Sequence, residues 1–172
     1  LSACFIRDVA AAVHAVPSSV GRQGYAVYAP AGAEAEMRSV LPSPFGLLLQ
    51  ADADLGQVLF RATRELLARG HDCVLLVNSD SPTLPTSLLV EAIAALRRAG
   101  DRAVLGPAID GGYYLIGLKT AHPHLFADIP WGTNDVARLS LERAAEIDLA
   151  AVFRPALGFE TLNVRFAEGR HP

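Results

Sequence analysis

The amino-acid sequence predicts an α/β fold of the Rossmann-like type with a mainly parallel sheet. Short apolar runs typical of buried strands alternate along the chain with segments of about 10–15 residues that have helical spacing. The clearest run, Val74 to Val77, consists of apolar residues alone, as in a strand that helices cover on both faces. Polar residues from Asn78 onward end this run at once. They therefore lie at the carboxyl end of the strand, where open α/β sheets bind ligands.

The individual elements follow from the same patterns. We expect strands at residues 25–29, 45–49, 74–77, 103–105, 113–118 and 149–153, and helices at residues 1–16, 31–40, 54–70, 88–96 and 134–147. The third helix is the best defined, because Asp54 at its start and Gln57 three residues later form a capping-box pattern. A doubly wound domain rarely begins on a helix. We therefore expect that its first strand and the loop after that strand precede Leu1.

The composition limits the function classes. The 172 residues fit one domain over positions 1–172, and 51% apolar with 19% charged residues is a globular composition. A net charge of −3 gives no basic surface for a nucleic-acid polymer. No apolar run approaches the roughly 18 residues of a membrane span. Cys4 and Cys73 lack the spacing of a disulfide or metal motif, which favours a reducing, cytoplasmic location.

The segment Asn78-Ser79-Asp80-Ser81-Pro82 is the first candidate site. Asp80 is a carboxylate on a rigid support, which suits a divalent cation that binds a phosphorylated substrate. The simpler interpretation is that Asp80 only shapes the turn before Pro82. The segment alone does not separate these two interpretations.

Two further clusters carry similar alternatives. Asp110-Gly111-Gly112 stands between two expected strands, where it fits either a tight hairpin or a loop whose backbone N–H groups approach a phosphate or sugar. Trp131 precedes the last helix, where it either lies over a ligand ring or fastens the helix to the core.

In combination these segments resemble a known family. The chain has Asp54-Leu55-Gly56, the segment around Asp80 with Leu84-Pro85, Leu105-Gly106-Pro107-Ala108, Asp110 to Leu118, and Phe126 with Ile129-Pro130-Trp131-Gly132-Thr133, in that order. This pattern is similar to that of the bacterial glycosyltransferase-like, radical-SAM/selenodomain-associated transferases. They belong to the nucleotide-diphospho-sugar transferase (GT-A) superfamily, together with the molybdenum-cofactor and 2-phospholactate guanylyltransferases.

The resemblance implies a three-layer GT-A domain in which Mg²⁺ or Mn²⁺ lies between an aspartate and a diphosphate. Carried onto this chain, Asp80 matches the aspartate near the metal and Asp110 to Gly112 match the loop on the acceptor side. Asp80 and Asp110 are thus the candidate catalytic residues, and Asp80 is the metal ligand. The candidate substrate-binding residues are Asn78, Ser79, Ser81, Gly111, Gly112, Tyr113 and Trp131.

The chain departs from the family pattern at two places. The glycine-containing nucleotide loop expected near the amino terminus is absent, as is the Asp-x-Asp pair expected near the carboxyl end. The segment Gly158-Phe159-Glu160-Thr161-Leu162 retains only the flanks of that second motif.

The resulting hypothesis is a metal-dependent transferase that moves a glycosyl or nucleotidyl group from a nucleotide-activated sugar or a nucleoside triphosphate to a small-molecule acceptor. The alternative is a catalytically degenerate module with the same fold that binds a nucleotide or a partner. The two absent motifs favour the alternative, and the intact clusters around Asp80 and Asp110 oppose it. A homo-oligomer is compatible with either hypothesis.

Overall fold

The structure is a computed structural model that describes residues 2–50 and 53–153. Its α-helices are α1 (Ser2–His14), α2 (Glu34–Val40), α3 (Leu55–Ala68), α4 (Thr86–Leu96) and α5 (Val136–Glu146), with short 3₁₀ helices η1 (Ser18–Val20) and η2 (Pro123–Phe126). The strands are β1 (Gly24–Tyr28), β2 (Phe45–Leu49), β3 (Val74–Val77), β4 (Arg102–Pro107), β5 (Tyr113–Leu118) and β6 (Ala150–Phe153). The mixed α/β class that the sequence predicts is confirmed.

The strands form two sheets. β1 and β2 make a parallel pair, and the other four strands lie in the order β3-β5-β4-β6. β5 runs antiparallel to β3 and β4, whereas β4 and β6 are parallel. The sequence predicts a mainly parallel sheet with the strand before Asp80 at its centre. In the described residues parallel pairing does not dominate, and that strand is an edge strand with an antiparallel partner.

The length of one connection explains the antiparallel pairing. β4 and β5 are joined by residues 108–112 alone. Parallel neighbours need a crossover of about a dozen residues or more, whereas antiparallel neighbours need only a tight turn. The tight-hairpin interpretation of Asp110-Gly111-Gly112 is thus confirmed, and β5 returns beside the strand that precedes it.

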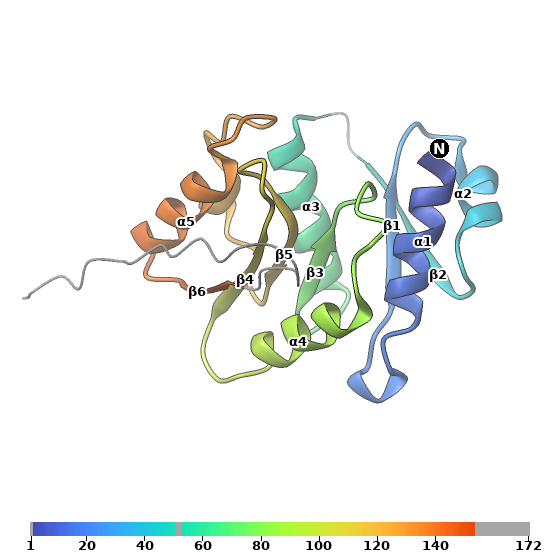
Figure 1. The fold of residues 1–172 in the computed structure, drawn as a ribbon, viewed down its shortest axis with the longest axis horizontal. Coiled ribbons are helices and arrows are strands. Elements are labelled where there is room, and N and C mark those ends of the chain that lie inside the picture. The colour runs from blue at the N-terminus through green and yellow to red at the C-terminus, as the bar shows by residue number, and fades with distance from the viewer. Residues whose placement is uncertain (1, 51–52, 154–172) are drawn as a thin grey trace, which may run out of the picture.

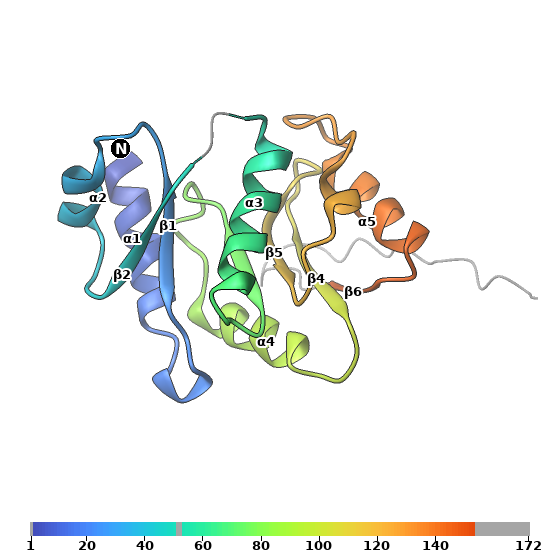
Figure 2. The same ribbon diagram turned by 180° about the vertical axis from the view of Figure 1, so that it is seen from behind.

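Helices cover both faces of the strands (Figures 1 and 2). On one face α4 and the end of α1 pack together, and the hydroxyl of Thr86 in α4 donates to the carbonyl of Ala12 in α1 at 3.0 Å. On the other face α3 and α5 pack with η2 against β4 and β5. α3 also reaches the parallel pair, because Ala62 and Leu66 share a cluster with Leu48 of β2 and Val74 of β3. The helices therefore hold the two sheets together.

The local signals of α3 act as the sequence predicts. The Asp54 carboxylate accepts a hydrogen bond from the backbone N–H of Gln57 at 2.9 Å, which satisfies one of the free amides of the first turn. Gly70 follows the helix with a positive φ of 93°, a conformation that favours glycine.

No helix among the described residues has both the length and the apolar character needed to cross a membrane.

Candidate functional site

Three loops and the start of one helix gather along the upper edge in Figure 1, where β3 and β4 end and β5 begins. The loops are residues 78–85 after β3, residues 108–112 of the β4–β5 hairpin and residues 127–135 before α5, and the helix is α3. This gathering at the carboxyl ends of β3 and β4 is what the sequence predicts for its candidate site.

Asn78 fastens the first loop to the second. Its side-chain amide donates to the carbonyl of Tyr113 at 3.0 Å, and its backbone N–H donates to the carbonyl of Tyr114 at 3.1 Å. The end of β3 is thereby held beside the start of β5, directly after Gly112. Beyond Asn78, Ser79 and Asp80 are exposed and Ser81 is half-buried. The Asp80 carboxylate therefore lies at the protein surface, two residues beyond the contact of Asn78 with β5.

The hairpin loop is shaped by its own polar groups. The Asp110 carboxylate accepts a hydrogen bond from the backbone N–H of Gly112 at 3.0 Å, and the Ala108 N–H donates to the Gly112 carbonyl at 2.9 Å. Gly111 has a positive φ of 85°, as the turn requires. Ile109 at the tip is 76% exposed. One oxygen of Asp110 is thus used to hold the turn.

The hairpin loop also contacts the beginning of α5. The Gly111 carbonyl accepts from the N–H of Ala137 at 2.9 Å, an amide of the first turn of α5. A Cβ atom at Gly111 would lie 1.9 Å from the carbonyl oxygen of Asn134. Glycine is therefore required here for contact as well as for backbone conformation, and no sequence pattern indicates Asn134 as the partner of this loop.

Trp131 is a half-buried packing residue at this edge. Its ring meets the ring of Tyr113 edge-on, with centroids 6.3 Å apart, and its indole nitrogen would lie 2.9 Å from a Cβ atom at Gly56. It thus joins the starts of β5 and α3, as the interpretation of Trp131 as a fastening residue requires. These distances explain the glycine of Asp54-Leu55-Gly56, since a Cβ atom there would also lie 2.6 Å from the backbone carbonyl oxygen of Phe126 and would push α3 away from this edge.

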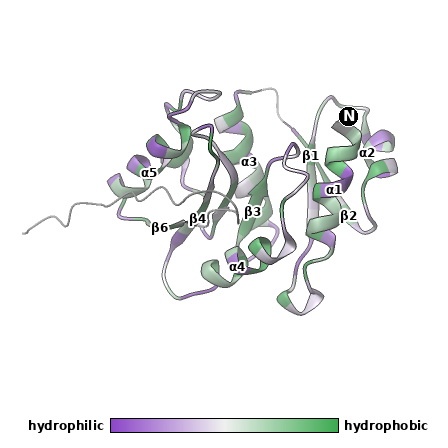
Figure 3. Cartoon of the chain, in the orientation of Figure 1, coloured by the Kyte–Doolittle hydropathy of each residue, from purple (hydrophilic) through white to green (hydrophobic). Residues whose placement is uncertain are grey.

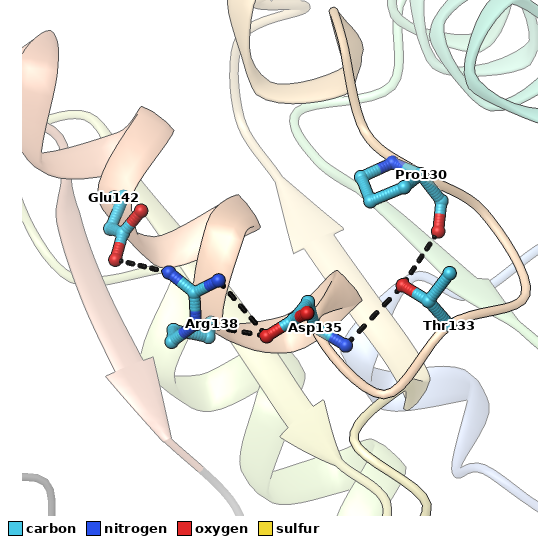
Figure 4. Close-up of polar contacts among 5 residues, drawn as sticks. All are labelled: Pro130, Thr133, Asp135, Arg138 and Glu142. Carbon is cyan, nitrogen blue, oxygen red and sulfur yellow. Dashed lines mark hydrogen bonds and ion pairs between the residues drawn. The ribbon is translucent and has the colours of Figure 1, made fainter.

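The turn after Trp131 is held to α5 by a small polar network (Figure 4). The Thr133 hydroxyl donates to the Pro130 carbonyl at 2.8 Å. Asp135 precedes α5, but its carboxylate makes no capping bond and instead accepts from Arg138, which also donates to Glu142 at 2.7 Å. The Asp135 carboxylate therefore does not cap α5, because it is bonded to the guanidinium of Arg138.

Tyr113 contributes to the edge mainly through its backbone. Its side chain is 8% exposed and lies among core residues, and burial raises the pKa of the Tyr113 hydroxyl, an effect that the neighbouring Ser140 partly offsets. Among the described residues neither the Tyr113 nor the Ser140 hydroxyl makes a hydrogen bond of normal geometry. Of the predicted binding residues, Tyr113 is the one that the fold buries most.

The carboxylates at this edge do not form a cluster. Within residues 2–50 and 53–153 no three His, Cys, Asp or Glu side chains lie close enough together to hold a metal ion by themselves. The second acidic motif that the family pattern expects, around Gly158 to Leu162, lies outside the described residues. The described edge thus offers Asp80 and Asp110 as separate carboxylates.

Comparison with known proteins shows the family of this chain. Residues 12–133, more than half of the chain, match the family described as "Uncharacterized protein conserved in bacteria (DUF2064)". The chain belongs to this family. The matched region of this DUF2064 member contains Asp54, Asp80, the hairpin loop and Trp131. We find no significant match among curated proteins.

A solved structure resembles this DUF2064 member closely. It is the crystal structure of a "putative nucleotide-diphospho-sugar transferase" from Desulfovibrio desulfuricans G20, which aligns with a TM-score of 0.79 at 27% sequence identity. The alignment covers 90% of this chain and 66% of that chain. The present chain thus spans just under two thirds of that protein.

Proposed function

We propose that this protein is a transferase that acts on a nucleotide-activated donor and moves a glycosyl or nucleotidyl group to a small-molecule acceptor. The observation that carries the proposal is the convergence of the Asp80 loop and the Asp110 hairpin at one edge, which Asn78 holds together. The likeness to a structure named as a nucleotide-diphospho-sugar transferase supports it. The three-layer GT-A arrangement belongs to the same proposal.

The residues at this edge fit a magnesium or manganese ion in one particular mode. Mg²⁺ is commonly bound by one or two carboxylates together with substrate phosphates and water, without a complete cage of protein ligands. Asp80 offers an exposed carboxylate, and no complete cage exists among the described residues. Asp80 would therefore hold the ion jointly with the diphosphate of the donor.

The proposed chemistry depends on charge. As the bond to the diphosphate breaks, negative charge develops on the leaving group, and a bound divalent cation supplies the opposite charge. Asp80 would orient the donor by holding that cation. Asp110 would accept the proton of the acceptor hydroxyl or hold the acceptor, through the carboxylate oxygen that the Gly112 amide does not use.

Other groups at the edge would bind the donor and the acceptor. Asn78, Ser79 and Ser81 would line the donor side, and the backbone of Gly111 and Gly112 would line the acceptor side. Tyr113 and Trp131 would support this surface from within, because Tyr113 is buried and Trp131 is half-buried. These roles complete the proposed site.

The test is calorimetric titration of the protein with UDP-, GDP- and CDP-type ligands, with and without Mg²⁺ or Mn²⁺. Wild type should bind one class of nucleotide only when metal is present. Asp80→Asn should lose most of the affinity and its dependence on metal, because an amide keeps the size but lacks the charge that holds a hard cation. Asp72→Asn is the matched control, since Asp72 is exposed at the opposite end of the same strand.

Melting curves separate lost binding from lost structure, because Asp80→Asn should have the same melting temperature as wild type. Equal, metal-independent binding by wild type and Asp80→Asn would remove the metal role of Asp80. Metal-independent nucleotide binding without transfer to any acceptor would instead support the degenerate binding module.

A further inference from the structure

β2 is an edge strand that lacks the usual features that prevent further pairing. Among the described residues it pairs only with β1, through five consecutive residues and without a bulge. Phe45–Leu49 contains no charged residue and no proline, and Figure 3 colours this strand largely as hydrophobic. Edge strands of soluble proteins usually carry charges, proline or bulges, because an open edge accepts another strand. β2 therefore presents an edge that is open to a further strand.

Backbone groups along this edge have no backbone partner in the described part of the chain. Directly after β2, the Gln50 N–H donates to the Tyr28 carbonyl of β1 at 2.7 Å. Alternate residues of a strand direct their N–H and C=O groups to opposite edges, so those of Leu47 and Leu49 face away from β1. Leu49 is also 51% exposed. The outer edge of β2 can therefore form hydrogen bonds with an added strand.

A groove of about 430 Å³ lies between the end of β2 and α3. Its apolar floor includes Leu48, Val58 and Ala62, each of which is no more than 7% exposed. Successive side chains of a strand point to opposite faces of the sheet, so every second side chain of a strand added to β2 would point to the face that carries this groove. The edge thus offers hydrogen bonds, and the groove beside it offers room for side chains.

Two arginines of α3 give the groove a positive charge. Arg61 and Arg64 line it, are exposed, and lie about one helical turn apart. Neither forms an ion pair within the described residues, although the Arg64 guanidinium lies 5.5 Å from the centre of the Phe60 ring. The acidic residue that lines the groove, Glu65, is already paired with Arg69. The groove therefore matches an acidic occupant.

The same charges argue against a second copy of this chain as the occupant. A two-fold axis perpendicular to the sheet would pair β2 antiparallel with its copy and place both α3 helices on the same face of the joined sheet. Arg61 and Arg64 of one copy would then lie on the same side as those of the other, and like charges across an interface oppose association. An acidic segment of another protein avoids this repulsion.

We propose that β2 and the groove beside α3 are a docking site for an extended, acidic peptide segment of a partner protein. The segment adds to β2 as a third strand and bonds to the backbone of Leu47 and Leu49. Acidic side chains at every second position enter the groove, where their methylene groups cover the apolar floor and their carboxylates reach Arg61 and Arg64. Backbone bonds supply affinity, and the arginines select for acidic side chains. The docking site uses neither Asp80 nor Asp110, so it is independent of the proposed transferase activity.

The test begins with selection from a library of displayed random peptides of about eight residues, which is long enough for one strand. The selected peptides should carry aspartate or glutamate at alternate positions. Fluorescence anisotropy then measures the affinity of one selected peptide. Arg61→Gln combined with Arg64→Gln should weaken its binding about tenfold or more, because the carboxylates lose both partners. Arg7→Gln combined with Arg98→Gln is the matched control, since it removes two exposed arginines outside the groove and should leave the affinity unchanged.

Two modified forms of the same peptide test the added strand. N-methylation of every second amide blocks one edge of a peptide strand. Methyl groups on the amides that face β2 should abolish binding, whereas methyl groups on the other set of amides should leave it intact. Hydrogen exchange at Leu47 and Leu49 should also slow when the unmodified peptide is bound.

The proposal is overturned if no peptide is selected, if the selected peptides are neutral or basic, or if the variant of Arg61 and Arg64 binds as tightly as wild type. Equal binding by both N-methylated peptides would show that the groove takes carboxylates without strand addition, which also overturns it. Self-association of the protein that the peptide competes away would assign the edge to a second copy instead. If the double variant fails to fold, the N-methylated peptides on wild type still decide.

Discussion

Gly111 is the residue at which two loops of the candidate site approach most closely. It combines a positive φ of 85° with a distance of 1.9 Å from its hypothetical Cβ to the Asn134 carbonyl oxygen. The sequence predicts a turn glycine at this position because glycine adopts positive φ. The contact with Asn134 could not be predicted, since it depends on where α5 begins relative to the hairpin.

This difference leads to a prediction about alanine substitutions. Gly111→Ala should lower the free energy of unfolding by about 3 kcal/mol, because backbone strain adds to a clash with a backbone atom that has to move. Gly32→Ala is the control: its φ is 93°, but nothing lies within 4 Å of the added Cβ. It should cost only the conformational strain of about 1–2 kcal/mol. Urea denaturation measures both, and equal losses would contradict the role of the Asn134 contact.

At the scale of elements, the sequence located strands and helices well and predicted their pairing less well. The predicted strands at residues 45–49, 74–77 and 113–118 agree with β2, β3 and β5. Strand position depends on local apolar runs and turn residues, which a sequence shows directly. Pairing depends on which edges meet in space. The alternation of strands and helices predicts a parallel neighbour for β3. Instead, the short connection 108–112 makes β5 antiparallel to β4, and β5 also pairs antiparallel with β3.

The start of α3 gives a prediction at this scale. Asp54→Ala should lower the free energy of unfolding by about 1 kcal/mol, because the Gln57 amide loses its acceptor. Asp54→Asn keeps an acceptor oxygen at the N-cap and should lose no more than a few tenths of a kcal/mol. Urea denaturation of the two variants makes the comparison. A loss of equal size in both would assign the effect to the charge of Asp54 and not to its hydrogen bond.

At the scale of the whole molecule, the described part of the chain combines two sheets that helices hold side by side. α3 contacts both sheets in one apolar cluster, and α1 connects to α4 through Thr86. The predicted gathering of the Asp80 and Asp110 segments at one edge follows from this arrangement, although β3 and β4 are not direct parallel neighbours, because β5 lies between them. A hairpin brings its loop to the carboxyl end of β4 just as a crossover would, so the location was predictable even where the topology was not.

Stability at high pH tests how this core holds Tyr113. Burial raises the pKa of Tyr113 in the folded state above the ordinary value of 10.0, at which tyrosine ionises in the unfolded chain. The folded state therefore retains a proton that the unfolded state loses, and the protein should lose stability as the pH rises above about 10. Below that pH the contribution of Tyr113 is fully present.

Tyr113→Phe should reduce this alkaline loss, because phenylalanine has no proton to lose. At pH 7 the variant should unfold within about 1 kcal/mol of wild type, since the hydroxyl that it removes is buried without a normal hydrogen bond. Urea denaturation at pH 7 and at several values above pH 10 measures both effects.

Tyr25→Phe is the control for this variant. It removes a half-buried hydroxyl that bonds to His71 at 3.2 Å and leaves Tyr113 in place, so the alkaline loss of stability due to Tyr113 should persist. Alkaline curves that are the same for wild type and Tyr113→Phe would show that Tyr113 ionises in the folded protein as easily as in the unfolded chain. Its position in the core between Trp131 and Ser140 would then have to be more open to water than its 8% exposure indicates.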